Sequence, residues 1–247
     1  MGSNPTFTSI MRIQFKQADV LIVFTFGTTT NKKIALPKEK IVQTYSFSRG
    51  QYEEAKQKTT MKDFFSKDAE VCMDCPFAVS NGAKLSACYT HKMMQYSGFL
   101  SSLKSIAKSY ESWDSIPTLN DEMIAQIVKQ SNGKYVRFGS YGEPSLIPIE
   151  LVEAIVNVAK SWTGYTHQWN QKPQYAEYFM ASTHTKAMEE IARSKGWRSF
   201  VATPTPIEGI TNCPASNEQG FKSHCSKCGL CSGTKGKGSK SVFIIEH

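Results

Sequence analysis

Seven cysteines carry the most specific chemistry in this sequence of 247 residues, and they fall into two sets. The set near the C-terminus is a Cys-x2-Cys-x2-Cys run preceded by a Cys-Pro pair. Its members are Cys213, Cys225, Cys228 and Cys231. Successive x2 spacings let one tight turn aim three thiolates inward, and a fourth cysteine completes the ligands of an iron–sulfur cluster or of tetrahedral zinc. The spacing predicts a metal centre here, with a [4Fe-4S] cluster and zinc both open.

The second set begins with Cys72-x2-Cys75-Pro, and Cys88 and His91 follow it along the chain. Three cysteines and a histidine would make a closed, structural zinc site. Three cysteines alone would leave one iron of a cluster open to a substrate or cofactor. Either arrangement requires the thiols to converge, since ligands at about 2.3 Å from one metal lie within about 4 Å of each other. A third interpretation treats these residues as small buried hydrophobic side chains.

Size and cysteine count favour metal ligands over disulfides. A chain that is 40% hydrophobic and 20% charged can bury a core without covalent staples, and an odd number of cysteines leaves one unpaired. The first residues lack a basic segment followed by an apolar one, and the apolar stretch 20–26 is too short to span a bilayer. We therefore expect a cytoplasmic protein without a membrane partner.

The charge balance points to an anionic partner. The sequence has 29 Lys and Arg against 21 Asp and Glu, a net charge of +8, which would favour nucleic acid. Much of this charge lies in scattered lysines and in the stretch 234–240, which would equally suit a solvated loop. Nucleic acid is thus one predicted partner, and a small-molecule substrate of unknown identity is the other.

Outside the cysteines, the predicted catalytic residues are Arg137, Tyr141, Glu143 and His167. The first three lie where a predicted strand passes into a glycine-rich loop, and His167 follows the next strand. His167 could act as a general base or could simply hydrogen-bond to its own strand end. Glu143 could equally be a solvent-exposed residue of a turn. The carboxyl ends of parallel strands lie at the same edge of a sheet. We therefore expect residues 137–143, 165–169 and 182–184 to line the mouth of one pocket, which Glu143 and His167 share.

The elements that must position these residues alternate regularly. Hydrophobic periodicity and turn residues predict strands over 11–15, 19–26, 42–48, 135–139, 164–167, 178–181, 198–202 and 242–245, and helices over 93–107, 120–131, 148–162 and 185–195. Strands separated by helices indicate parallel βα units, so we predict an α/β fold with a full or partial TIM-like barrel. One domain, 1–247, would contain a β-rich N-terminal segment (1–50), an α/β core (51–205), a cysteine-rich metal-binding loop (206–240) and a final strand (241–247).

A short element resembles a cofactor-binding motif. Gly142-Glu143-Pro is similar to the Gly-Gly-Glu-Pro element with which radical-SAM barrels hold the amino group of S-adenosylmethionine. Tyr141 replaces the first glycine, and the usual Cys-x3-Cys-x2-Cys motif is absent. The resemblance implies that Gly142 and Glu143 bind S-adenosylmethionine.

The order of motifs over residues 45–245 resembles the bacteriophage gene-product-eighty-eight-like proteins and their cysteine-rich phage relatives. The shared features are Cys-x2-Cys-Pro with a later Cys-Tyr, an Arg-x-Gly-x-x-Gly strand end, an aromatic-Thr-His-x-Trp stretch and a terminal cysteine cluster. The resemblance implies a phage or mobile-element metalloprotein, located in the host cytoplasm, and no particular reaction. Together with the Gly-Glu-Pro element, the cysteine sets lead us to expect a radical-SAM-like enzyme acting on a small molecule or nucleotide. The alternative is a zinc-stabilised nucleic-acid-binding or structural protein without catalysis.

Overall fold

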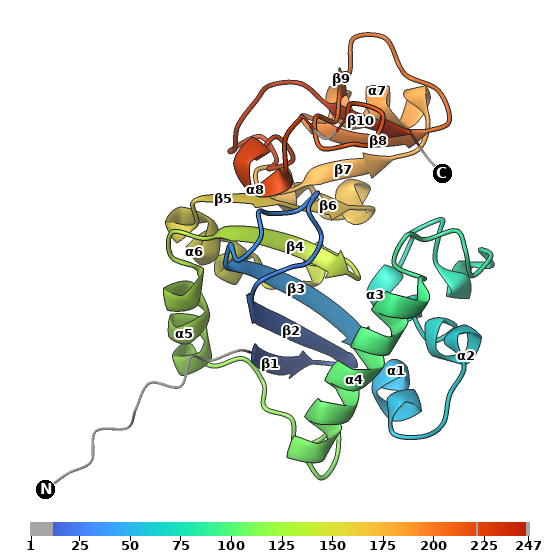
Figure 1. The fold of residues 1–247 in the computed structure, drawn as a ribbon, viewed down its shortest axis with the longest axis vertical. Coiled ribbons are helices and arrows are strands. Elements are labelled where there is room, and N and C mark those ends of the chain that lie inside the picture. Colours follow the sequence, from blue (N-terminus) through green and yellow to red (C-terminus); the bar gives the residue numbers. More distant parts are fainter. Residues whose placement is uncertain (1–11, 221, 246–247) are drawn as a thin grey trace, which may run out of the picture.

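The computed structural model describes residues 12–220 and 222–245. This part of the chain forms a mixed α/β structure with two five-stranded sheets, which follow one another along the long axis of the molecule (Figure 1). The first sheet has the strand order β1-β2-β3-β4-β5 and the second the order β6-β7-β8-β10-β9. The predicted α/β class is therefore confirmed.

The first sheet is mixed. β1 (Arg12–Gln17) and β2 (Val20–Gly27) form an antiparallel hairpin, and β3 (Ile41–Ser48) pairs antiparallel with β2. β4 (Tyr135–Tyr141) and β5 (Ser161–Thr163) then add in parallel. Most residues of β2 are buried, as its almost continuously apolar sequence requires, because a strand covered on both faces does not alternate.

The second sheet is entirely parallel. It consists of β6 (Tyr165–Thr166), β7 (Met180–Thr183), β8 (Ser199–Thr203), β10 (Val242–Ile245) and β9 (Thr211–Asn212). The chain passes from β5 of the first sheet to β6 of the second through Gly164 alone. A Cβ atom at Gly164 would lie 2.5 Å from the Phe179 ring, so only glycine fits at this crossing.

Helices cover the sheets and fill the connections between strands. Polar N-caps fix several of their starts: the side chain of Ser48 forms a capping box with Gln51, and that of Asn120 accepts from the amide of Met123. The α-helices are α1 (Arg49–Ala55), α2 (Met61–Phe65), α3 (Ala69–Cys72), α4 (Met93–Ser109), α5 (Asp121–Ser131), α6 (Ile149–Val158), α7 (Lys186–Ser194) and α8 (Cys225–Cys228). Short 3-10 turns are η1 (Val79–Asn81), η2 (Pro144–Leu146), η3 (Gln168–Asn170) and η4 (Pro173–Tyr175).

The structure corrects the barrel prediction, because the described residues form no closed sheet. A parallel barrel closes only when every strand runs the same way and the last strand pairs with the first. Here β1, β2 and β3 are antiparallel neighbours, and the chain leaves the first sheet at Gly164 to start another. The predicted helix over 148–162 also ends early, at Val158, and the residues after it form β5.

No helix in the described part of the chain is long and apolar enough to cross a membrane.

Candidate functional site

The Cys72–Cys75 segment is a tight turn at the end of α3. The amide of Cys75 donates to the carbonyl of Cys72 across 2.9 Å, and Met73 between them has φ 48° and ψ −120°. These angles are those of the first central residue of a type II′ turn, a position that favours glycine. A methionine therefore holds a strained backbone conformation here, and the turn presents two thiols from one short loop.

A buried carboxylate, Asp68, fixes the loop that follows this turn. Its side chain is fully buried, and its two oxygens accept hydrogen bonds from the amides of Val79 and Ser80 at 3.1 and 3.0 Å. Burial raises the pKa of both Cys72 and Cys88, and the negative charge of Asp68 adds to each shift. The sequence gives no signal for Asp68, since a single aspartate before a short helix matches no motif.

Cys75 and Cys88 lie within electrostatic reach of Cys72. Burial raises the pKa of the Cys72 thiol far above its usual value, and the nearby Cys75 and Cys88 raise it further. Cys88 Sγ lies 3.0 Å from the hydroxyl of Thr90. The raised pKa values of Cys72 and Cys88 keep these two thiols protonated without a neutralising cation. A metal ion bound to these thiols would relieve the repulsion between thiolates and displace their protons.

His91, the predicted fourth ligand, is held by groups of the hydrophobic core. Its Nδ1 lies 3.0 Å from the carbonyl oxygen of Leu85, and its ring centroid is 4.1 Å from that of Phe65. Burial lowers the pKa of His91, so its imidazole is neutral at pH 7. Its role as a ligand stays a prediction.

Glu143 follows β4 and is directed inward, with 3% of its surface exposed. Its Oε2 accepts from the hydroxyl of Thr166 at 2.6 Å, and its Oε1 accepts from the amide of His167 at 2.8 Å and pairs with His167 Nδ1 at 3.1 Å. The turn before it needs Gly142, whose φ is 75° and whose added Cβ would lie 2.8 Å from Ser46 Cβ. The structure therefore brings Glu143 and His167 into direct contact, with the carboxylate orienting the imidazole.

A second histidine joins this pair. His184 follows β7, the neighbour of β6, and its Nε2 lies 3.1 Å from Nε2 of His167, with the two rings 15° from parallel. The edge of Phe77 packs against the His184 ring, with the centroids 4.8 Å apart. Strand ends from both sheets thus meet at one place, because β4 leads to Glu143 while β6 and β7 lead to the two histidines.

The electrostatics of the histidine pair link it to the first cysteine set. Burial disfavours the charged form of His167, but hydrogen bonds with Cys75 and Glu143 outweigh it and raise the pKa of His167 to about 10. Burial, and then the charge of His167, lower the pKa of His184 to about 4. At neutral pH one imidazolium and one neutral imidazole therefore face each other beside the Cys75 thiol.

The other two predicted catalytic residues have different surroundings. Tyr141 is 2% exposed, and its hydroxyl accepts from Gln51 Nε2 at 2.6 Å, so it is a core residue. Arg137 donates from Nη2 to the hydroxyl of Tyr89 at 2.8 Å. Tyr89 is also within electrostatic reach of Cys88 and Cys225. The Arg137–Tyr89 pair therefore lies between the two cysteine sets and is separate from the histidines in its contacts.

The C-terminal cysteines lie on segments that are anchored by the backbone. The amide of Cys213 donates to a carbonyl of β10 at 2.8 Å, and the amide of Cys225 donates at 2.9 Å to a carbonyl of the loop between β2 and β3. The carbonyl of Cys231 accepts from the amide of Gly164 at 3.0 Å. Distant parts of the chain thus bring these cysteines to the junction of the two sheets, where Figure 1 shows α8 next to β5.

The four thiols of this set influence one another. Burial raises the pKa of Cys225 to about 11, and Cys213 and Cys228 add to that shift. Burial also raises the pKa of Cys231 strongly, although the hydroxyl of Tyr165 donates a hydrogen bond to it and opposes the shift. As at the first set, neutral thiols would give way to thiolates if a cation were bound.

A buried arginine organises the cysteine-rich loop. Arg198 is 6% exposed, and in the described chain no carboxylate lies within ion-pair distance of it. Its guanidinium instead donates to backbone carbonyls, with shortest distances of 2.6 Å to Gly233, 2.7 Å to Leu230, 2.9 Å to Lys240 and 3.1 Å to Lys237. No motif marks Arg198 in the sequence, because its partners are backbone atoms.

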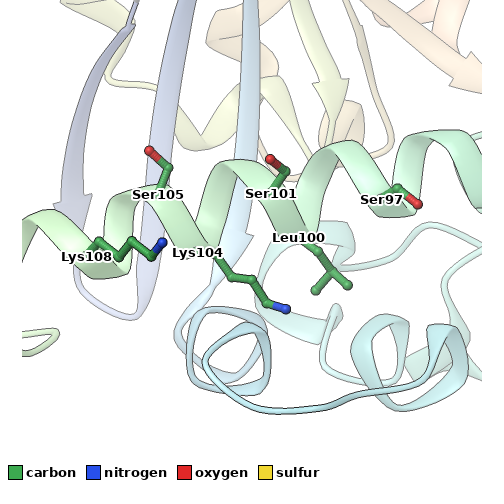
Figure 2. A pocket seen from close by; sticks show the side chains of 6 residues that line it. All are labelled: Ser97, Leu100, Ser101, Lys104, Ser105 and Lys108. Atoms are coloured by element: carbon green, nitrogen blue, oxygen red, sulfur yellow. The ribbon is translucent and has the colours of Figure 1, made fainter.

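Two surface hollows are lined by lysines and serines. One, of about 570 Å³, runs along α4, and Figure 2 shows its lining residues, Ser97, Leu100, Ser101, Lys104, Ser105 and Lys108. The other, of about 600 Å³, lies beside α8, and its charged lining residues are Lys38, Glu39, Lys160, Lys227 and Lys237. Neither hollow includes Glu143 or His167, so their opening onto a common pocket stays a prediction.

Within residues 12–220 and 222–245, no group of three or more His, Cys, Asp or Glu side chains is arranged as a ready-made metal site. The nearby thiols and imidazoles would have to adjust to bind an ion. No family model, no curated protein and no solved structure matches the chain.

Proposed function

We propose that the protein is a metalloprotein with two cysteine centres, one at Cys72, Cys75 and Cys88 and one at the four C-terminal cysteines. One observation carries the proposal: all seven cysteines are free, and neighbouring cysteines add to the raised pKa of Cys72 and Cys88 in the first set and of Cys225 and Cys231 in the second. Thiols that are only partly buried, as five of these seven are, and that repel one another as thiolates contribute little to a core of this size. A bound cation would stabilise the thiolates and so explain why the cysteines are grouped.

The C-terminal centre has the donors for a [4Fe-4S] cluster or for tetrahedral zinc. Because the backbone of these cysteines is hydrogen-bonded to distant parts of the chain, a metal there would stabilise the junction of the two sheets. The first centre has polar neighbours, Glu143, His167 and His184, and we propose that it is the reactive one. On this proposal the protein is a metal-dependent enzyme acting on a small molecule or nucleotide.

S-adenosylmethionine does not fit Glu143 as the Gly-Glu-Pro resemblance implied. Both carboxylate oxygens already accept hydrogen bonds from Thr166 and His167, and the side chain is almost fully buried. The amino group of the cofactor would have to displace these donors. We therefore assign Glu143 to positioning His167 and derive no step through S-adenosylmethionine.

Replacing Cys228 with Ser is expected to release the metal of the C-terminal centre and to expose residues 213–231 to protease, because the metal links these segments. Replacing Cys72 with Ser is expected to release only the metal of the first centre. Metal analysis of anaerobically purified full-length protein, with limited proteolysis, measures both effects. Brown protein containing iron and sulfide indicates clusters, and colourless protein with stoichiometric zinc indicates zinc.

Replacing the exposed Met94 with Ser is the control, which should leave both metals bound. Wild-type protein that binds neither zinc nor iron under reducing conditions would contradict the proposal. Full metal content in both cysteine variants would contradict it as well.

A second candidate function, binding of nucleic acid, is favoured by the hollow beside α8. Four lysines against one glutamate line this hollow, which would attract a phosphate backbone. On this alternative the C-terminal metal is structural and holds the lysines in place. It is compatible with a catalytic first centre.

Replacing both Lys160 and Lys227 with Ala is expected to weaken binding of a labelled oligonucleotide. The slope of log K against log salt should fall by about 0.7–0.9 for each phosphate that the variant no longer neutralises. Fluorescence anisotropy over a range of salt concentrations measures this, and the matched control replaces Lys104 and Lys108 of α4. An unchanged slope in the first variant would rule out this hollow as the binding surface.

A further inference from the structure

We propose that His167 and His184, together with Cys75, bind a zinc-type divalent cation at the first cysteine centre. The inference rests on the proposed function and deepens it, because it replaces an all-thiolate ligand set with a mixed one. None of the ligand spacings in the sequence pairs these residues, since His184 lies beyond the next strand.

The distance between the two imidazoles is that of two ligands on one ion. Their Nε2 atoms lie 3.1 Å apart and face each other, with the ring planes 15° from parallel. Two nitrogens bound to a tetrahedral zinc at about 2.0–2.1 Å are about 3.3 Å apart. A small outward movement of either ring would therefore admit the ion between them. Without metal, a shared proton must lie between the two nitrogens.

Glu143 prepares His167 for this role. Its carboxylate binds Nδ1 of His167, which fixes the proton on that nitrogen and turns Nε2 toward His184. Metal-binding histidines commonly donate their second ring N–H to a carboxylate in this way. Thr166 and the amide of His167 hold the carboxylate in turn, so the orientation is built into the backbone after β6.

The third ligand comes from the strained turn after α3. Cys75 lies on this turn near His167, since it contributes to the raised pKa of the His167 imidazole. Asp74 of the same turn accepts hydrogen bonds from Gln168 and Gln171 at 3.0 and 2.8 Å. These bonds join the turn to the segment that carries His167 and so hold Cys75 near this imidazole.

The donor chemistry selects the ion. Two imidazoles and a thiolate suit zinc, and cobalt(II) takes the same position as a spectroscopic substitute. A four-iron cluster held by Cys72, Cys75 and Cys88 alone would use neither histidine. The two assignments of the first centre are therefore separable by experiment.

Full-length protein, stripped of metal by a chelator and kept reduced, is titrated with cobalt(II). We expect wild-type protein to give the visible absorption of tetrahedral cobalt with thiolate and nitrogen ligands. His184→Ala and His167→Ala should each lose one cobalt per chain or bind it at least about tenfold more weakly. Glu143→Gln, which keeps the shape, should weaken binding by about tenfold or more. His224→Ala, an imidazole beside the other centre, should leave the cobalt of the first centre unchanged.

Because a histidine variant could misfold, the wild-type protein supplies a second measurement. Two equivalents of zinc, enough to fill both proposed centres, should shift the Nε2 ¹⁵N resonances of two histidines and leave their Nδ1 resonances in the protonated range. Unchanged cobalt spectra and stoichiometry in both histidine variants, or zinc binding without any imidazole shift, would overturn the inference. If Cys72→Ser still removes metal in that case, the proposed function survives and only the histidine ligands are wrong. If no metal binds at all, both fail.

Discussion

Replacing Arg198 with Gln or Lys is expected to release the cysteine-rich loop and to lower the free energy of unfolding by about 3 kcal/mol or more. Arg198 is buried, and its guanidinium holds the carbonyls of four loop residues at once. Hydrogen bonds to a charged donor are worth about 1.5–3 kcal/mol each, and their loss also leaves buried carbonyls unpaired. A lysine ammonium cannot reproduce the planar arrangement of N–H donors that the guanidinium provides. Urea unfolding and hydrogen exchange of amides 230–240 measure the loss.

The matched control for Arg198 is Arg193→Gln. Arg193 is exposed and makes only a 3.7 Å ion pair with Glu189 one helical turn away. Such a pair contributes about 0.5 kcal/mol or less, so this variant should unfold almost as the wild type does. Equal, small losses in the two variants would show that the loop does not depend on the buried guanidinium.

The second large effect is expected for Gly142→Ala, which should lower the free energy of unfolding by about 3 kcal/mol. A left-handed conformation costs a residue with a Cβ about 1–2 kcal/mol. The new Cβ would also lie 2.8 Å from Ser46 Cβ and 3.0 Å from the Ser46 carbonyl oxygen, so the backbone must shift. Because Glu143 follows directly, its hydrogen bonds with His167 should weaken as well. Thermal or urea unfolding gives the first effect, and the ¹⁵N shift of His167 Nδ1 gives the second.

Gly133→Ala separates the two causes. Gly133 has φ 67°, close to the φ of 75° at Gly142, but a Cβ there would meet no atom within 4 Å. The free energy of unfolding of this variant should therefore fall only by the cost of the left-handed conformation, about 1–2 kcal/mol. Equal losses of unfolding free energy in the two variants would show that the contact with Ser46 is relieved without strain. Glu143 would then keep its position.

Local sequence patterns were sufficient to predict most of the strands and longer helices. Alternating and apolar runs located β3, β4, β8 and β10 to within about two residues, and Asn120 caps α5 as its side chain type predicts. The failure lies at residues 159–163. There the apolar pattern continued beyond α6, but Ala159 is extended and the chain enters β5. Short buried strands and helix ends share the same composition, so periodicity cannot separate them.

The topology prediction was wrong for two physical reasons: β1, β2 and β3 pair antiparallel, and the chain changes sheets at Gly164. The order of strands and helices is that of parallel βα units, and it says nothing about where one sheet stops. Gly164 decides this, because the close approach of Phe179 lets the chain change sheets within one residue. That approach involves residues that are separate in the sequence.

By itself, the sequence determined the grouping of the cysteines into two sets and the α/β class, and it marked Glu143 and His167 as candidate functional residues. Each of these depends on residue type and local spacing. Only the tertiary structure decided which groups meet. It placed His184 against His167, buried Tyr141 in the core, paired Arg137 with Tyr89 and fixed the cysteine-rich loop on Arg198. These contacts join strand ends and loops that are distant in the chain. They follow from how elements that are distant in the sequence pack against one another, and no local pattern encodes that packing.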